Sequence, residues 1–218
     1  MAVEWTARVR DVLIHAKDTR SLILEPSHRI DFAPGQFVSC QVPHEATVLN
    51  RPYSIASTPT DPHLELLLNL VPGGPGSTHL FARRPGDILR LTGPWGTFIT
   101  GDLPGDAETI FIAEETAIAP IRPMLLEVAR RPSRPPLRLL YGTSLALYRD
   151  ELAALPGLTI DVVPPATLYT EAARRWIDDD LDKSRRFFIC GVGTPVLTLR
   201  DRLRAAGHVR RAVQYERW

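Results

Sequence analysis

The sequence has few cysteines and no clustered histidines. Among its 218 residues, the two cysteines, Cys40 and Cys190, are too few for a disulfide framework. They lie far apart in the sequence, and the six histidines form no zinc-type pair. We therefore expect a reduced, cytoplasmic protein with no structural metal.

Long apolar segments and a large excess of one charge are also absent. No apolar run approaches the roughly 18 residues that cross a membrane. The first residues, MAVEWTARVRDV, lack the apolar stretch of a secretory signal. The formal net charge of +1 gives no electrostatic reason to expect an anionic polymer or surface as a partner. We expect no nucleic-acid partner and no membrane span.

The first hundred residues follow a strand pattern. Short runs alternate apolar and polar residues, as half-buried strands do, and turn residues separate the runs. The runs are residues 5–16, 19–27, 35–43, 51–59, 63–71 and 87–94. Six short strands at this spacing predict an antiparallel barrel or sandwich. One short helix is predicted over residues 77–85, with Ser77 or Thr78 as its N-cap.

From about residue 106, runs with the pattern of buried strands alternate with runs that have helical apolar spacing. Strands are predicted at 108–115, 136–144, 158–165, 185–193 and 212–218, and helices at 118–131, 147–155, 169–181 and 195–207. This alternation predicts a mostly parallel sheet with helices on both faces. The segment LPGD, residues 103–106, is the expected joint, which gives domains of residues 1–102 and 103–218.

The segment RPYS, Arg51 to Ser54, combines a cation, an aromatic ring and a hydroxyl on one strand. Alternation along the strand points Arg51 and Tyr53 to the same side. Arginine binds phosphate through two parallel hydrogen bonds, the ring can stack on a flat heterocycle, and Ser54 can bond a ring nitrogen or carbonyl. The segment can also be a solvated edge strand with no ligand.

The segment LVPGGPGSTHLF, Leu70 to Phe81, places three glycines and a Ser-Thr pair beside a short helix. Such a loop can form an anion site lined by backbone amides. A simple hairpin turn is the alternative. The segment PGDILRLTGPWGTF, residues 85–98, reads as a turn, a strand and a glycine-rich exit from the barrel.

Taken together, the order and spacing of these motifs resemble the ferredoxin–NADP reductase superfamily. Its flavin-binding barrel carries an R-x-Y-S strand, a G-x-x-S/T loop, P-G-D and G-P-x-G-x-F, and the later segments AIAP, LLYG, YRDEL, FFICG and ERW match as well. The resemblance implies an N-terminal antiparallel six-stranded β-barrel that binds flavin and a C-terminal α/β parallel-sheet domain of the NAD(P)-binding kind. It also implies an FAD-dependent NAD(P)H oxidoreductase that passes electrons to a ferredoxin or an oxygenase component.

The resemblance assigns roles to the barrel strand. It implies that Arg51 binds the flavin phosphate and that Tyr53 packs against the isoalloxazine ring, with Pro52 between them in the cofactor-binding strand. Ser54 is expected near flavin N5, where hydride arrives, and is therefore a candidate catalytic residue.

The same resemblance assigns roles to the loop that follows. Leu70 and Val71 are expected to lend backbone contacts to the ring. Gly76, Ser77 and Thr78 are expected to hold the pyrophosphate, which favours FAD over FMN.

In the second domain, the resemblance implies a nicotinamide site. Cys190 and Gly191 match a C-G pair that follows a buried strand beside the docking place of nicotinamide. Glu216 matches a C-terminal acid that helps to polarise the site, so Cys190 and Glu216 are candidate catalytic residues. Trp218 is expected to cover the other flavin face or the adenine. Each residue also has a purely structural alternative. Cys190 can be a small core residue, Glu216 an exposed carboxylate and Trp218 a hydrophobic plug.

One segment departs from the family pattern. Members that use nicotinamide cofactors show G-G-T-G-I-A-P where this chain has EETAIAP, residues 114–120. The glycines allow close approach of the pyrophosphate. Two like charges about 4 Å apart cost roughly 4 kcal/mol at an effective dielectric of about 20. The arginine that often follows LLYG is also absent. Glu114 and Glu115 therefore predict a closed phosphate cradle, which makes NAD(P)H use doubtful.

Several interpretations stay open. A glutamate can turn inward and replace the ligand's phosphate at the helix N-terminus. The glutamates can instead point to solvent and leave Thr116 and the helix amides to bind a shifted nicotinamide cofactor. For the chain as a whole, one alternative to the reductase is an FAD-containing electron-transfer subunit of a larger complex, with lost or weak NAD(P)H use. The other is a flavin- or nucleotide-sensing module that regulates a partner and has no redox role.

Overall fold

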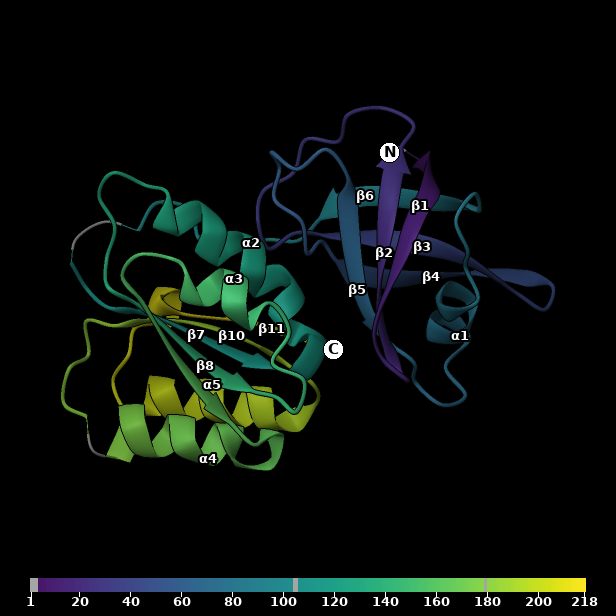
Figure 1. Ribbon diagram of the computed structural model, residues 1–218. Helices are drawn as coiled ribbons and strands as arrows, with labels where there is room; N and C mark the ends of the chain where they lie inside the picture. The colour runs from purple at the N-terminus through teal and green to yellow at the C-terminus, as the bar shows by residue number, and fades with distance from the viewer. Residues whose placement is uncertain (1–3, 104–105, 179) are drawn as a thin grey trace. The chain divides into compact units, whose positions relative to one another are not determined.

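The computed structural model describes residues 4–103, 106–178 and 180–218. The chain divides into two units, Met1–Ile99 and Thr100–Trp218. Each unit contains one sheet (Figure 1). The joint predicted at residues 103–106 includes residues 104 and 105, which lie outside the described residues.

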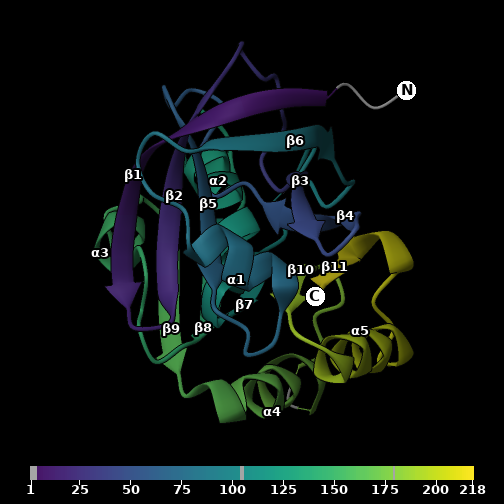
Figure 2. The ribbon, with the colours of Figure 1, turned by 90° about the vertical axis from the view of Figure 1, so that its right-hand side faces the viewer.

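The first unit is an antiparallel six-stranded barrel, as the sequence predicts (Figures 1 and 2). The strands follow the order β4-β3-β6-β1-β2-β5. An antiparallel bridge between Ile55, directly after β4, and Leu66 of β5 joins the two ends of the sheet. The bounds are β1 (Glu4–Ala16), β2 (Thr19–Pro26), β3 (Phe37–His44), β4 (Thr47–Ser54), β5 (Leu64–Asn69) and β6 (Ile88–Trp95).

The alternating pattern of the strands fills the barrel. In β1, for example, Trp5, Ala7 and Val9 are buried, while the residues between them are more exposed. Strand β5 is buried on both sides, and it carries a charged residue, Glu65, whose carboxylate accepts a hydrogen bond of 2.6 Å from the Ser21 hydroxyl. A buried charge needs such a partner, and this hydrogen bond also joins β2 to β5.

The helix α1 (Pro75–Phe81) begins earlier than predicted. Its N-cap is Gly74, and Pro75 occupies its first position, where the fixed φ of proline suits a helix start. Ser77 and Thr78 lie inside the helix, so the prediction that one of them is the cap was wrong. The Ser77 hydroxyl instead accepts a hydrogen bond from the Val71 amide at 3.0 Å, which ties the preceding loop to the helix.

The second unit has the predicted parallel sheet, with the order β11-β10-β7-β8-β9. Helices α2 and α3 lie on one face and α4 and α5 on the other (Figure 1). The strands are β7 (Thr109–Glu114), β8 (Leu137–Gly142), β9 (Leu158–Val163), β10 (Arg186–Gly191) and β11 (Val213–Arg217). The α-helices are α2 (Ile118–Ala129), α3 (Arg149–Ala153), α4 (Leu168–Ala173) and α5 (Thr194–Ala205). The short 3-10 helices are η1 (Glu115–Ala117), η2 (Pro165–Thr167) and η4 (Arg210–Ala212), and the π-helix η3 (Arg174–Asp178) continues α4.

The order of the strands marks one edge of this sheet as a place for a ligand. The chain runs from β7 outward through β8 and β9, and then returns to the other side of β7 to form β10 and β11. Ligands of open parallel sheets bind beyond the carboxyl ends of the strands, at the point where the strand order reverses. Here that point lies between β7, which ends at Glu114, and β10, which ends at Gly191.

Two further findings concern the described part of the chain. None of its helices has the length and apolar composition that crossing a membrane requires. No group of three or more His, Cys, Asp or Glu side chains in this part is placed to hold a metal ion.

Removing the side chain of Leu66 tests the closure of the barrel. Leu66 is fully buried, so Leu66→Ala is expected to lower the free energy of unfolding by about 2–5 kcal/mol. Leu13→Ala, at a position that is 42% exposed, is the matched control and should cost less than about 1 kcal/mol. Urea unfolding of both variants measures the difference, and equal losses would contradict the assigned core.

Candidate functional site

Strand β4 brings an arginine and a tyrosine to one side of the barrel. Arg51 and Tyr53 are half-buried, whereas Asn50 and Pro52, which alternate with them, are exposed. A methyl group added to Gly76 in α1 would lie 2.7 Å from Arg51 Cγ and 3.2 Å from Tyr53 Oη. The structure therefore brings Arg51, Tyr53 and Gly76 together, as the motif spacing implies. Pro52 points away from this group.

Arg51, Tyr53 and Gly76 together form a cradle on the barrel. The charges in this cradle suit an anionic, flat ligand. Arg51 donates a hydrogen bond to the Asn50 carbonyl at 3.1 Å, and within the described residues no carboxylate forms an ion pair with it. Burial raises the pKa of Tyr53 to about 12, with the nearby Cys40 acting in the same direction and Arg51 against it. At neutral pH the cradle thus presents a cation beside a neutral aromatic ring.

Ser54, the last residue of β4, has an unsatisfied hydroxyl. Its side chain is buried, and its Oγ has no hydrogen-bond partner among the residues that the structure describes. Buried polar atoms are nearly always hydrogen-bonded, because an unsatisfied one costs about 1–3 kcal/mol. A ring nitrogen or carbonyl of a bound ligand would satisfy this hydroxyl, so Ser54 fits the role that the resemblance implies.

The loop before α1 uses most of its polar groups internally. The Leu70 amide donates to the Asp18 carbonyl at 2.8 Å, and the Val71 amide donates to Ser77 Oγ. The Ser77 hydroxyl lies 3.2 Å from each of the Val71 and Gly74 carbonyls. The exposed side chains of Leu70 and Val71 therefore remain for ligand contact in place of their amides. Of the residues predicted to hold pyrophosphate, Gly76 provides close approach and Thr78 an exposed hydroxyl.

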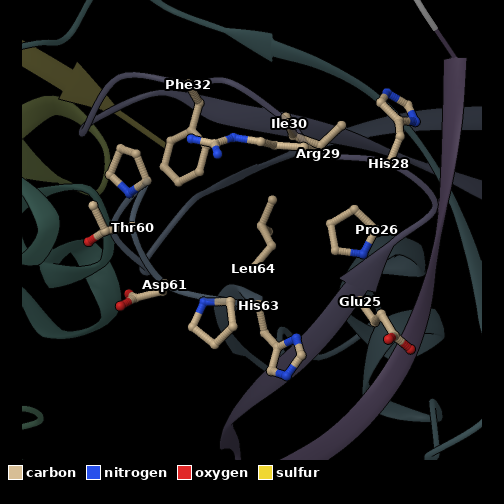
Figure 3. Close-up of a pocket in the computed structure, with 12 residues that line it drawn as sticks. Glu25, Pro26, His28, Arg29, Ile30, Phe32, Thr60, Asp61, His63 and Leu64 are labelled. Carbon is tan, nitrogen blue, oxygen red and sulfur yellow. The ribbon is translucent and has the colours of Figure 1, made fainter.

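A separate hollow of about 610 Å³ opens on the barrel (Figure 3). Residues 25–32 and 59–64 contribute its lining, which includes Phe32, His63 and Leu64. None of the residues predicted from the sequence to bind a cofactor lines it. The hollow and the cradle around Gly76 are therefore different features of the barrel.

In the second unit, Glu115 follows β7 and turns its side chain toward the loop after β8. Its carboxylate accepts hydrogen bonds from Thr143 Oγ1 at 2.9 Å, Ser144 Oγ at 3.0 Å and the Ser144 amide at 3.2 Å. The α2 helix has Ala117 as its N-cap and no side-chain cap. Glu115 thus turns inward, but it satisfies the neighbouring loop and leaves its own helix uncapped.

Glu114 makes the corresponding contact on the other side of β7. Its Oε2 accepts hydrogen bonds from the Tyr169 hydroxyl at 2.9 Å and the Val192 amide at 3.0 Å. A methyl group on Gly191 would lie 2.1 Å from Tyr169 Oη and 2.9 Å from Glu114 Oε2. Gly191 therefore makes room for this pair of side chains. The interpretation in which both glutamates point to solvent is wrong.

Sequence reasoning did not identify the partners of the two glutamates. The segment after LLYG indicated only a missing arginine, although the two adjacent hydroxyls of Thr143 and Ser144 after a buried strand are a usable signal for an anion. Tyr169 comes from α4, far along the chain, and no local pattern connects it with Glu114. Thr116 is buried within η1.

Cys190 and Glu216 lie next to each other at the ends of β10 and β11. They are register partners in the parallel pair. Cys190 is fully buried, and burial, together with the charges of Glu216 and Glu114, raises the pKa of its thiol well above the ordinary value. Burial also raises the pKa of Glu216 to about 7, and its Oε2 has no partner among the described residues. The thiol stays neutral, while the carboxyl can change charge near neutral pH.

Trp218 is held by its backbone beside the same strand ends. Its amide donates to the Gly191 carbonyl at 3.1 Å, and its carbonyl accepts from the Gly193 amide at 3.0 Å. The indole is 42% exposed, so it is available to contact a ligand.

Replacing Glu216 tests the effect of its burial on stability. Because the pKa is raised in the folded state, the contribution of the protonated carboxyl is complete below the ordinary value of 4.5 and is lost as the pH rises through about 7. Glu216→Gln should therefore be more stable than the native chain at about pH 8, by up to about 3 kcal/mol, and equally stable near pH 4. Urea unfolding at both pH values measures this.

Glu45→Gln is the control, because it makes the same chemical change at an exposed position. A Glu216→Gln protein with the same pH dependence as the native chain would show that the carboxyl is solvated.

Comparison with known proteins places these features in a family. The oxidoreductase FAD-binding domain family matches residues 7–99. Ferredoxin–NADP reductase B of Sorangium cellulosum is 38% identical over 128 residues, which are 57% of this chain and 52% of that protein. Methane monooxygenase component C of Methylosinus trichosporium is 33% identical over 130 residues, which are 58% of this chain and 37% of that protein. The chain thus spans about half of the first relative's length and less of the second.

Both units have a counterpart of known structure. The cytochrome P450 reductase GcoB of Amycolatopsis is 26% identical, with a TM-score of 0.82 over 99% of this chain and 70% of that one. The matched barrel, the related reductases and the shared two-unit fold agree with the motif pattern of the sequence. Residues 7–99 thus match an oxidoreductase FAD-binding domain, and the chain is similar to ferredoxin–NADP reductases in sequence and in its two-unit fold.

Proposed function

We propose that the chain is an FAD-dependent reductase that takes electrons from a reduced nicotinamide and passes them to an acceptor protein. The observations that carry this proposal are the cradle of Arg51, Tyr53 and Gly76 and, at the end of the same strand, the unsatisfied hydroxyl of Ser54. The cradle lies within the matched FAD-binding domain. When bound, FAD supplies the conversion between two-electron and one-electron transfer.

The barrel residues have distinct tasks in this proposal. Arg51 binds a phosphate of the cofactor with two hydrogen bonds, and Tyr53 packs its neutral ring against the isoalloxazine. Gly76 lets the pyrophosphate approach α1, and Thr78 adds an exposed hydroxyl, which favours FAD over FMN. Ser54 donates its unused hydroxyl hydrogen to the ring near N5.

The second unit provides the site for the nicotinamide ring. Cys190 and Gly191 form its floor at the end of β10, and Trp218 supplies an exposed aromatic surface. Glu216, whose pKa is raised to about 7, can hold a proton beside this floor at neutral pH. In this arrangement Cys190 acts as a small neutral contact, because its thiol stays protonated.

The acceptor is proposed from the relatives. Methane monooxygenase component C is named as part of an oxygenase system, and the Sorangium relative is named for ferredoxin. We therefore expect a ferredoxin or an oxygenase component to receive the electrons. Both cysteines are free and buried, which suits the reducing cytoplasm in which we place the chain.

Substitution of Arg51 tests the cofactor site. Arg51→Met removes the cation but keeps an unbranched apolar side chain, and it should weaken FAD binding at least about tenfold, because a charge-assisted pair of hydrogen bonds is lost. Arg90→Met changes an exposed arginine of β6 and is the matched control. Titration of the cofactor-free chain with FAD, followed by flavin fluorescence, gives both affinities. Native affinity in Arg51→Met would exclude the cradle as the phosphate site.

Anaerobic reduction tests the activity. The FAD-loaded chain should lose its flavin absorbance when an excess of dihydronicotinamide riboside, NADH or NADPH is added, and an added oxidised ferredoxin should restore it. A chain that binds no flavin would refute the proposal. A chain that binds FAD but accepts no electrons from any reduced nicotinamide would instead support the electron-transfer subunit.

A further inference from the structure

The carboxylate of Glu114 lies at the point where the strand order of the parallel sheet reverses. Glu114 ends β7, and its two hydrogen-bond donors, the Val192 amide and the Tyr169 hydroxyl, belong to the loop after β10 and to α4. A ligand of such a sheet would meet these donors first, because its site lies beyond the strand ends at this point. The chain's own carboxylate already occupies them.

The carboxylate of Glu115 occupies a second set of donors. One backbone amide and two hydroxyls, from Thr143 and Ser144, converge on it. Converging amides and hydroxyls of this kind are what proteins use to bind a phosphate. Glu115 therefore stands in for an anionic group of a ligand.

The backbone conformation of Glu115 fixes the position of its side chain. Its φ is +48°, in the left-handed region that side-chain-bearing residues seldom adopt. The Tyr141 hydroxyl fixes the turn by donating to the Glu115 carbonyl at 3.0 Å. A glycine would adopt this backbone freely, whereas Glu115 adopts it against its conformational preference, with its carboxylate held by three donors.

The charges of the two glutamates are not neutralised. Within the described residues, no arginine or lysine forms an ion pair or a hydrogen bond with either carboxylate. All the donors that reach them are neutral hydroxyls and amides. The strand ends therefore carry two adjacent negative charges, which repel a dianionic pyrophosphate and leave the uncharged dihydronicotinamide riboside unaffected.

Resting on the proposed function, we propose that Glu114 and Glu115 determine the specificity of the hydride-donor site, excluding the pyrophosphate of a dinucleotide and favouring a reduced nicotinamide that lacks the ADP group. The two carboxylates occupy the donors that a pyrophosphate would need. NADH and NADPH must displace both before they bind, whereas dihydronicotinamide riboside has no group that competes for these donors.

A binding measurement tests the exclusion without any electron transfer. ADP-ribose carries the pyrophosphate and no nicotinamide, so calorimetric titration of the FAD-loaded chain with it reports on the phosphate site alone. In Glu114→Gln with Glu115→Gln, the amides keep the size of the side chains and remove both charges. ADP-ribose should bind this variant at least about tenfold more tightly than the native chain.

Two further variants complete the comparison. Glu114→Gly with Glu115→Gly removes the side chains as well, and its gain should be at least as large, because glycine suits the backbone at residue 115. Glu151→Gln, which changes a carboxylate of α3 that pairs with Arg122, is the matched control and should leave the affinity unchanged. Thermal unfolding of every variant establishes whether it is folded. If the glycine variant does not fold, the glutamine variant still tests the inference.

Steady-state reduction gives the second readout. In both double variants, the ratio of kcat/KM for NADH to that for dihydronicotinamide riboside should rise at least about tenfold, with the riboside value nearly constant. Tight ADP-ribose binding by the native chain, or an unchanged ratio in a folded variant, would overturn the inference. Failure of the FAD-loaded chain to be reduced by either donor would overturn the proposed function instead, so the two failures are distinguishable.

Discussion

Gly76 has no side chain, and Arg51 and Tyr53 occupy the space that one would fill. This close approach joins α1 to β4 and sets a cation and a neutral ring side by side on the barrel. The remaining features of the cofactor site follow from it, because the buried Ser54 hydroxyl ends the same strand and Ser77 ties the loop before α1 to the helix. The cradle has an unpaired charge and an unsatisfied hydroxyl, and a ligand can supply partners for both.

The second unit treats its ligand-binding edge differently. Its strand ends also converge on a ligand-binding place, yet the chain fills that place with Glu114 and Glu115 and satisfies both carboxylates with its own amides and hydroxyls. The fold is that of a nucleotide-binding domain, while its strand ends carry two carboxylates that the chain's own donors bind. We propose that these carboxylates favour a ligand without phosphate. The barrel has unpaired groups that a cofactor can bind, and the second unit carries two carboxylates at its strand ends. Both features are consistent with a reductase whose electron donor differs from a plain dinucleotide.

Much of the fold was predictable because burial alternates with clear periods. The strands of the barrel and the strand–helix alternation of the second unit follow hydrophobic patterns that neighbouring residues determine. The grouping of Arg51 with Tyr53 was predictable for the same reason. The cap of α1 was predicted wrongly, because Pro75 fixes the helix start and Ser77 bonds backward to the loop.

The contacts of the two glutamates could not be predicted from local pattern. The departure from glycine at residues 114 and 115 was visible, but the direction of each side chain depends on residues that are distant in sequence. Tyr169 lies 55 positions from Glu114, and Val192 lies 78 positions from it. Only the folded sheet brings these groups to one edge.

A crystal structure of the chain with FAD tests the central claim most directly. The account predicts that the Arg51 guanidinium lies within hydrogen-bond distance, about 2.7–3.2 Å, of a cofactor phosphate oxygen, and that Ser54 Oγ contacts the isoalloxazine ring. FAD bound elsewhere, for example in the hollow between residues 25–32 and 59–64, with Arg51 in solvent, would contradict it.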